Sequence, residues 1–121
     1  MGLAAGILLV LISIAHNIYG EKKQIPQLKE LTNDSVQIGS QRIMIFQGGF
    51  ILLAVGIMQI LLGLDIIVLE GLSRYFLVAI VLINFCTALF ITLFFHREIV
   101  KVTLPQFILF IVIIFLQLAS L

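Results

Sequence analysis

The chain has 121 residues, of which 62% are hydrophobic and 11% are charged, and its net charge is +1 at pH 7. Soluble domains carry roughly a quarter charged residues, so seven basic and six acidic residues are too few to cover a water-soluble fold. The small net charge and the lack of a basic stripe exclude a nucleic-acid-binding protein, and we expect the surface to face a lipid bilayer.

Four apolar segments are long enough to cross a bilayer, because about 20 helical residues span its hydrocarbon core. Their apolar runs are continuous, whereas strands of a membrane barrel alternate apolar and polar residues. No cationic region precedes the first segment, so we interpret it as a retained helix and not as a signal peptide. The sequence predicts an all-α membrane protein, an antiparallel up-down-up-down bundle of four transmembrane helices at about 3–19, 43–64, 75–95 and 104–121.

Both prolines are expected near the start of a helix. Pro26 lies in the only long connection, residues 20–41, and favours the first turn of a short helix there. We expect this amphipathic loop to lie at the membrane surface, as a docking patch or as a plain connector. In the last segment, Thr103 is a candidate N-cap and Pro105 a candidate first-turn residue.

Cations are distributed unevenly between the two ends of the predicted bundle. The connection between the second and third helices contains only Arg74. The first and third connections contain the other six cations: Lys22, Lys23, Lys29, Arg42, Arg97 and Lys101. The positive-inside rule therefore predicts that loops 20–41 and 96–103 are cytoplasmic and that both termini lie outside.

Glycines mark a helix-packing seam in the second helix. Gly49, Gly56 and Gly63 repeat every seven residues, which keeps them on one stripe of a left-handed helix crossing, and Gln59 falls beside this stripe. Small residues let two helix backbones approach closely in a membrane. The last helix has almost no small residues, so we expect it to be the most exposed to lipid or to another subunit.

Polar residues gather toward the cytoplasmic ends of the first and third predicted helices. The candidate ligand or proton site comprises His16, Glu21, Asn84, Thr92, His96 and Arg97. In the third helix, Asn84, Thr92 and His96 share one face because their spacings are multiples of four. Polar groups within a membrane bundle usually face protein, and they often mark functional sites.

Three interpretations of this cluster remain open. In the first interpretation, the polar side chains form interhelical hydrogen bonds, and both histidines lie in the interfacial zone of the membrane. Alternatively, His16 and His96 ligate a metal or a b-type haem. In the third interpretation, Glu21 or Glu98 handles protons or substrate together with a histidine.

The function is predicted largely from what the apolar segments lack. No charged residue lies in the middle of a predicted helix, which argues against a proton-coupled transporter, and no enzymatic motif is present. We therefore predict a small non-catalytic accessory or structural subunit of a larger integral membrane complex, such as a respiratory or membrane-monooxygenase assembly, with other membrane subunits as partners and no cofactor. The alternatives are a cofactor- or proton-handling protein with its site at His16 and His96, and a small channel or carrier that acts as a homo-oligomer.

Overall fold

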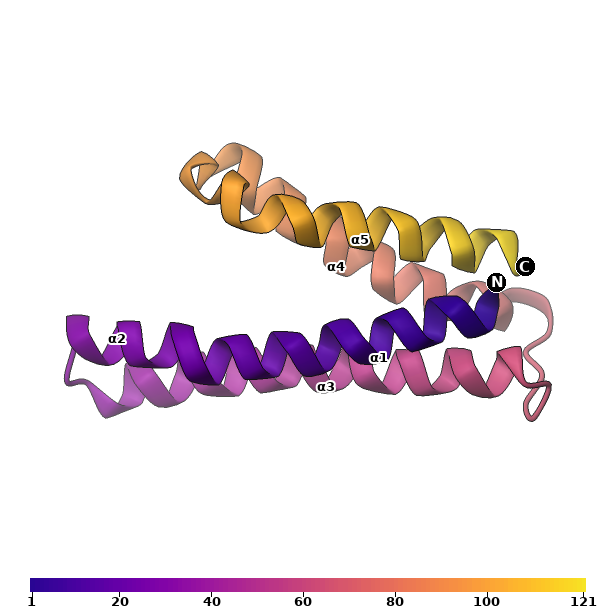
Figure 1. The fold of residues 1–121 in the computed structure, drawn as a ribbon, viewed down its shortest axis with the longest axis horizontal. Coiled ribbons are helices and arrows are strands. Elements are labelled where there is room, and N and C mark those ends of the chain that lie inside the picture. Colours follow the sequence, from indigo (N-terminus) through magenta and orange to yellow (C-terminus); the bar gives the residue numbers. More distant parts are fainter.

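The computed structural model describes residues 1–121, and its regular structure is entirely helical (Figure 1). The long helices are α1 (Gly2–Tyr19), α3 (Ser35–Gly63), α4 (Phe76–Phe94) and α5 (Val100–Ala119). The short helical segments are η1 (Gly20–Gln24), α2 (Ile25–Leu31), η2 (Gly71–Tyr75) and η3 (Arg97–Ile99). These elements join into four stretches that are long and apolar enough to cross a membrane: Gly2–Leu31, Ser35–Gly63, Gly71–Phe94 and Arg97–Ala119.

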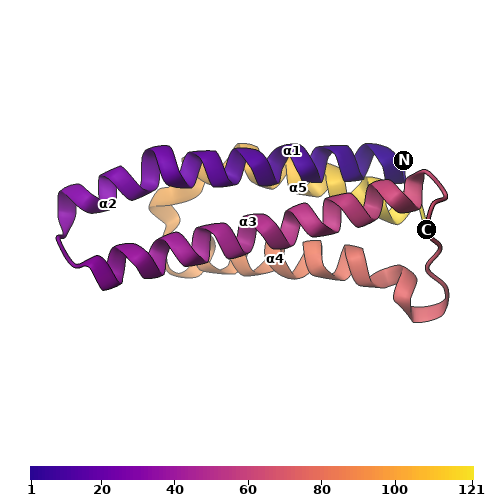
Figure 2. The same ribbon diagram turned by 90° about the horizontal axis from the view of Figure 1, so that it is seen from below.

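The four long helices form two pairs. Helix α1 lies along α3, which is the most extensive helix contact, and α4 lies beside α5 (Figures 1 and 2). The pairs meet at the end of the molecule that holds both termini and separate toward the end that holds α2 and η3 (Figure 1). Side chains from all four helices form the apolar core: Leu9, Ile12, Leu52, Val55, Leu77, Val81, Phe110 and Ile113.

The short helix expected at Pro26 is present as α2, with the proline in its first turn. The expected loop at residues 20–41 is, however, wrong in extent. Only residues 32–34 are not helical, because α2 continues α1 and α3 begins directly afterwards (Figure 1). The N-cap of α3 is Asp34, whose Oδ1 accepts a hydrogen bond of 3.0 Å from the backbone N–H of Val36. This cap satisfies a backbone donor that the first turn leaves free, so α3 starts well before its apolar segment.

The helical stretch that begins with α1 continues through Gly20 and Pro26. Segment η1 is a π-helical turn in which the Ile25 N–H donates to the Gly20 carbonyl. Proline lacks an N–H and its ring crowds the preceding turn, and the wider π-helical turn accommodates it. Gly20 is required for packing: a Cβ at this position would lie 2.3 Å from Cγ2 of Ile45 on α3.

Helix α5 also begins earlier than expected. Thr103 is not its N-cap but lies within its first turns, where its Oγ1 donates to the Ile99 carbonyl over 3.0 Å. Pro105 lies inside the helix and not in the first turn. The turn η3 leads directly into α5, so the helix gains a polar turn ahead of its apolar run.

Glycines on both α1 and α3 allow the close approach of these helices. A Cβ on Gly56 would lie 3.0 Å from the backbone N of Val10, and one on Gly6 would lie 2.8 Å from the backbone N of Ile60. Added side-chain atoms would therefore meet backbone that moves only with its helix. The glycines that face the backbone of the opposite helix in this way are Gly6, Gly56 and Gly63, whereas Gly49 faces the Asn17 side chain of α1.

Helix α3 ends in a left-handed residue, Asp65, with φ of 56°. The Asp65 N–H donates to the Leu62 carbonyl over 3.1 Å, and the Ile66 N–H donates to the Leu61 carbonyl over 2.9 Å. This pattern is a Schellman motif, which satisfies the last carbonyl groups of a helix. Aspartate tolerates the left-handed region better than most residues, and the motif holds Asp65 at the end of α3.

Candidate functional site

His16 lies on α1 and contacts α3. Its Nε2 is 3.1 Å from the Ile45 carbonyl oxygen. The ring also lies beside Gly48 of α3, where a Cβ would make an ordinary van der Waals contact with Nε2 at 3.7 Å. A carbonyl oxygen only accepts hydrogen bonds, so Nε2 carries the proton in neutral His16. The other ring nitrogen, Nδ1, is then an acceptor.

His96 lies in the exposed turn that joins α4 to α5. Its Nδ1 is 3.0 Å from Oε1 of Glu98, and the Nε of Arg97 donates to the Leu93 carbonyl over 2.9 Å. The three charged or titratable side chains of this turn are thus held by partners in the turn itself or at the end of α4.

The structure gives the two histidines separate surroundings. His16 is on the α1–α3 pair and His96 is on the α4–α5 pair, and their hydrogen-bond partners are Ile45 and Glu98, respectively. No hydrogen bond or ion pair joins the two imidazoles. No group of three or more His, Cys, Asp or Glu side chains is arranged to hold a metal ion.

Glu21 forms an ion pair that ties η1 to α3. The Nε and Nη2 of Arg42 donate to the two carboxylate oxygens of Glu21, each over 2.9 Å. Bidentate pairing of this kind fixes geometry as well as charge. The carboxylate that was a candidate proton carrier is therefore part of a helix-to-helix contact.

The polar face predicted on α4 is not buried as a unit. Thr92 is buried, with 1% of its surface exposed, whereas Ala88, one turn away, is exposed. Asn84 is partly buried, and its Nδ2 donates to the Ile80 carbonyl of the same helix over 3.4 Å. Of the residues on this face, only Thr92 is fully enclosed by protein.

A cleft between α1 and α5 borders His16. It has a volume of about 410 Å³, and its apolar lining includes Ile12 and Leu109. Its polar lining comprises His16, Tyr19, Gln24, Thr103 and Gln106, and His96 is not part of it. Of the predicted ligand residues, only His16 lines this cleft.

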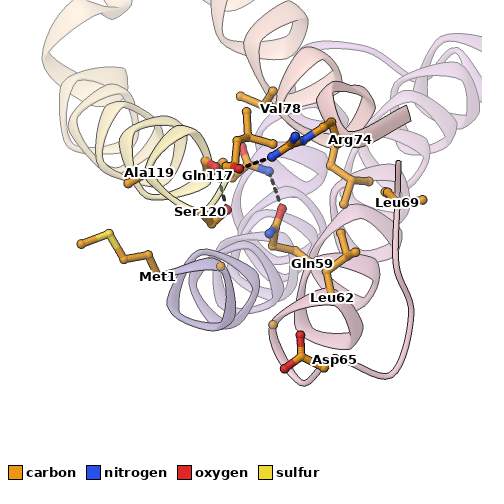
Figure 3. Close-up of a pocket in the computed structure, with 14 residues that line it drawn as sticks. Met1, Gln59, Leu62, Asp65, Leu69, Arg74, Val78, Gln117, Ala119 and Ser120 are labelled. Atoms are coloured by element: carbon orange, nitrogen blue, oxygen red, sulfur yellow. Dashed lines mark hydrogen bonds between the residues drawn. The ribbon is translucent and has the colours of Figure 1, made fainter. Parts of the chain in front are cut away.

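A second cavity, the terminal cavity, lies at the end of the molecule that holds both termini (Figure 3). Its volume is about 440 Å³. Within it, Nε2 of Gln117 donates to Oε1 of Gln59 over 3.1 Å, and both glutamines are buried, at 2% and 5% exposed, respectively. The Oε1 of Gln117 is buried without a hydrogen-bond partner. Asp65 and Arg74 also line this cavity, and Arg74 donates to the Leu121 carbonyl.

Sequence analysis did not predict the pair of glutamines. Each is a single amide within an apolar run, and an amide in such a run usually needs a partner on another helix. This signal identifies Gln59 and Gln117 as residues that require partners. It does not identify them as each other's partner, because that depends on how α3 meets α5.

Comparison with protein-family models, curated proteins and solved structures finds no match to this chain. Its function is therefore inferred from the geometry and chemistry of the chain itself.

Proposed function

We propose that this protein is a small non-catalytic subunit of a larger integral membrane complex and that α5 is its contact surface for other subunits. The observation that carries the proposal is an apolar stripe on α5 whose members are 50% to 66% exposed. We call it the α5 stripe: Leu104, Ile108, Ile111, Phe115 and Leu118. Its spacings alternate between four and three residues, as at a helix–helix interface.

Membrane insertion is supported by how little of the apolar sequence is buried within the chain. The buried share of the apolar window is 33% in Gly2–Leu31 and in Ser35–Gly63, and it falls to 17% in Arg97–Ala119. Exposed apolar surface on this scale favours lipid over water. In the proposed orientation, the chain crosses the membrane four times in up-down-up-down order, with both termini outside and the cation-rich end cytoplasmic.

The choice of α5 as the contact surface follows from the unequal packing of the two helix pairs. Helix α1 is held against α3 by close backbone approach at Gly6 and Gly56, and by the ion pair of Glu21 with Arg42. Helix α5 has the least buried apolar window. Apolar helices in lipid associate through shape and not through the hydrophobic effect, and the large side chains of the α5 stripe supply that shape.

Hydrogen bonds of the predicted site residues support a packing role for them. Glu21 pairs with Arg42, Asn84 bonds its own helix, and Arg97 bonds the end of α4. Each of these contacts is made within this chain and orients no group toward a shared centre.

The test is extraction from the native membrane in mild detergent, followed by native electrophoresis and mass spectrometry of co-migrating proteins. We expect co-migration with larger membrane subunits. A variant in which alanine replaces Ile108, Ile111 and Phe115 of the α5 stripe should lose this co-migration. The matched control replaces three α1 residues of similar spacing that are 46% to 58% exposed: Ile7, Leu11 and Ile14. A chain that migrates alone, or two variants that behave alike, would refute the proposal.

A second candidate function is ligand binding in the cleft beside His16. The supporting observation is that His16 borders a cleft of about 410 Å³ together with Thr103 and Gln106. With Nε2 bonded to Ile45, the acceptor Nδ1 remains for a hydroxyl or a metal ion.

This candidate is tested by metal analysis and an absorption spectrum of the purified chain. His16→Ala should remove a bound chromophore or metal, while His96→Ala, outside the cleft, should retain it. Wild-type protein without either species, and unchanged by both substitutions, would refute a metal or haem at His16.

A further inference from the structure

The cleft beside His16 is lined by polar groups without a partner in the chain. The Tyr19 hydroxyl and the amides of Gln24 and Gln106 make no intrachain hydrogen bond. The Thr103 hydroxyl donates to carbonyl groups one turn earlier, so it offers only an acceptor. Since Nε2 of His16 is bonded to the α3 backbone, Nδ1 is also an acceptor. The cleft therefore offers both donors and acceptors to a hydroxyl group.

The lining of this cleft changes with depth in the same order on both helices. Along α1, the lining residues run from the apolar Ile12 to His16 and then to Tyr19. Along α5, Gln106 precedes the apolar Leu109. Helix α1 runs toward the end of the molecule that holds η3, and α5 runs away from it (Figure 1). The apolar lining is therefore deepest, and in the proposed orientation the polar lining lies nearer the cytoplasmic surface.

Lys23 places a cation beside the outer part of the cleft. Its ammonium lies 5.9 Å from the centre of the Tyr19 ring, and it forms no ion pair. The cleft itself is lined by no Asp, Glu, Lys or Arg, and the carboxylates of η1 and η3 are hydrogen-bonded to an arginine and a histidine, respectively. Tyr19 and Gln24 add O–H and N–H donors at this depth. This layer therefore suits a phosphate, whose oxygens accept several charge-assisted hydrogen bonds.

We infer that this cleft binds a single-chain lipid with a free hydroxyl next to a terminal phosphate, the chemistry of lysophosphatidic acid. The acyl chain lies along the apolar lining at Ile12 and Leu109. The hydroxyl donates to Nδ1 of His16 and accepts from the amide of Gln106. The phosphate pairs with the ammonium of Lys23.

The dimensions of the cleft agree with this ligand. Tyr19, which marks the depth of the cation, is three residues from His16, or about 4.5 Å along the helix axis. Hydroxyl and phosphate are on neighbouring carbons in this lipid, so one molecule reaches both layers. The cleft volume of about 410 Å³ lies within the roughly 300–1,000 Å³ of small-molecule sites.

The inference rests on the membrane insertion and on the ligand-binding cleft proposed above, and it names the class of ligand. It does not rest on partner docking by α5, because no residue of the α5 stripe lines the cleft. Co-migration with other subunits and lipid binding by the purified chain are therefore separate results, and either can fail without the other.

The experiment measures ligand retention by the delipidated full chain in dodecyl maltoside, using native mass spectrometry and three probes of equal chain length. Lysophosphatidic acid has both polar groups, its 2-deoxy analogue lacks the hydroxyl, and monoacylglycerol lacks the phosphate. We expect each analogue to be retained roughly fivefold less than lysophosphatidic acid, the effect of one neutral hydrogen bond or of one exposed ion pair. Retention of either analogue equal to that of lysophosphatidic acid would overturn the inference.

Substitutions separate the two polar contacts. Gln106→Leu and His16→Ala should weaken retention of lysophosphatidic acid but not of the 2-deoxy analogue, and Gln106→Leu breaks no intrachain hydrogen bond. Its control is Gln47→Leu, which replaces an exposed glutamine of α3 outside the cleft. Lys23→Gln should weaken retention of both phosphates and spare monoacylglycerol, while Lys29→Gln, at an exposed lysine of α2, should change neither. Equal losses in a variant and its control would overturn the assigned contact.

Two further measurements identify the source of a failure. Soluble glycerol 3-phosphate has the same polar groups without the chain: if it does not displace the lipid at equal concentration, the lipid is the ligand, and displacement would overturn that assignment. A metal bound at His16 without retention of lysophosphatidic acid would keep the ligand-binding cleft and refute the lipid.

Reconstitution into phosphatidylcholine vesicles, followed by an alkaline carbonate wash, tests insertion separately. A chain that stays in the vesicles but shows no preference for lysophosphatidic acid would refute the lipid site and leave membrane insertion intact. A chain that is washed from the vesicles would refute insertion, and the inference with it.

Discussion

The contact between α1 and α3 makes Gly6 sensitive to the addition of a single methyl group. A Cβ on Gly6 would lie 2.8 Å from the Ile60 backbone N and 2.9 Å from the Gly56 carbonyl oxygen. Both atoms belong to the backbone of α3, so Gly6→Ala must shift one helix relative to the other. Overpacking of this kind costs about 1–3 kcal/mol, while alanine in place of glycine favours a helix by about 1 kcal/mol.

Gly39→Ala is the matched control, because Gly39 is also helical and a Cβ there would meet nothing within 4 Å. Both substitutions change helix propensity alike, so the difference between them isolates overpacking. We expect Gly6→Ala to be less stable than Gly39→Ala by about 1–3 kcal/mol. The assay is unfolding in mixed dodecyl maltoside and SDS micelles, followed by circular dichroism. Equal free energies of unfolding would show that α1 does not approach α3 this closely.

Three further predictions concern polar contacts, and the same unfolding assay checks them. Asp34→Ala should lower the free energy of unfolding by about 1 kcal/mol through loss of the N-cap, whereas Asp34→Ser should retain most of the wild-type stability. Equal stability of the two variants would contradict the cap. Charge-removing glutamines at Glu21 and Arg42 should show a coupling of roughly 0.2–1 kcal/mol in a double-mutant cycle, since a pair whose side chains are 42% and 39% exposed is screened by solvent. Leucine at either Gln59 or Gln117 should destabilise by about 1–3 kcal/mol, and leucine at both should cost less than the two single changes together; additive losses would argue against their hydrogen bond.

Helix positions were the most predictable part of the fold. The predicted segments 3–19 and 75–95 differ by one residue at each end, or not at all, from α1 and α4. The length of a continuous apolar run identifies a membrane-spanning helix from local sequence alone. The short helix predicted at Pro26 is present as α2. The prediction was wrong at η1 and the first turns of α3, because a π-helical turn and an N-cap extend helices independently of hydropathy.

The candidate site was much less predictable. His16 and His96 were predicted to lie together because both fall near the cytoplasmic ends of their predicted helices. In the structure, they have separate partners on different helix pairs. Depth along a helix follows from residue number, whereas the direction in which a side chain points depends on the rotation and tilt that neighbouring helices impose.

Local sequence thus accounts for four long apolar helices and for a stripe of glycines that needs a close neighbour, because length, composition and spacing act within one segment. Only the tertiary structure decides that α1 covers that stripe, that Glu21 pairs with Arg42, and that Gln59 pairs with Gln117. The residues of these two pairs are 21 and 58 positions apart, respectively. Contacts over such separations form only when the helices have packed, and packing selects the partner of each polar group.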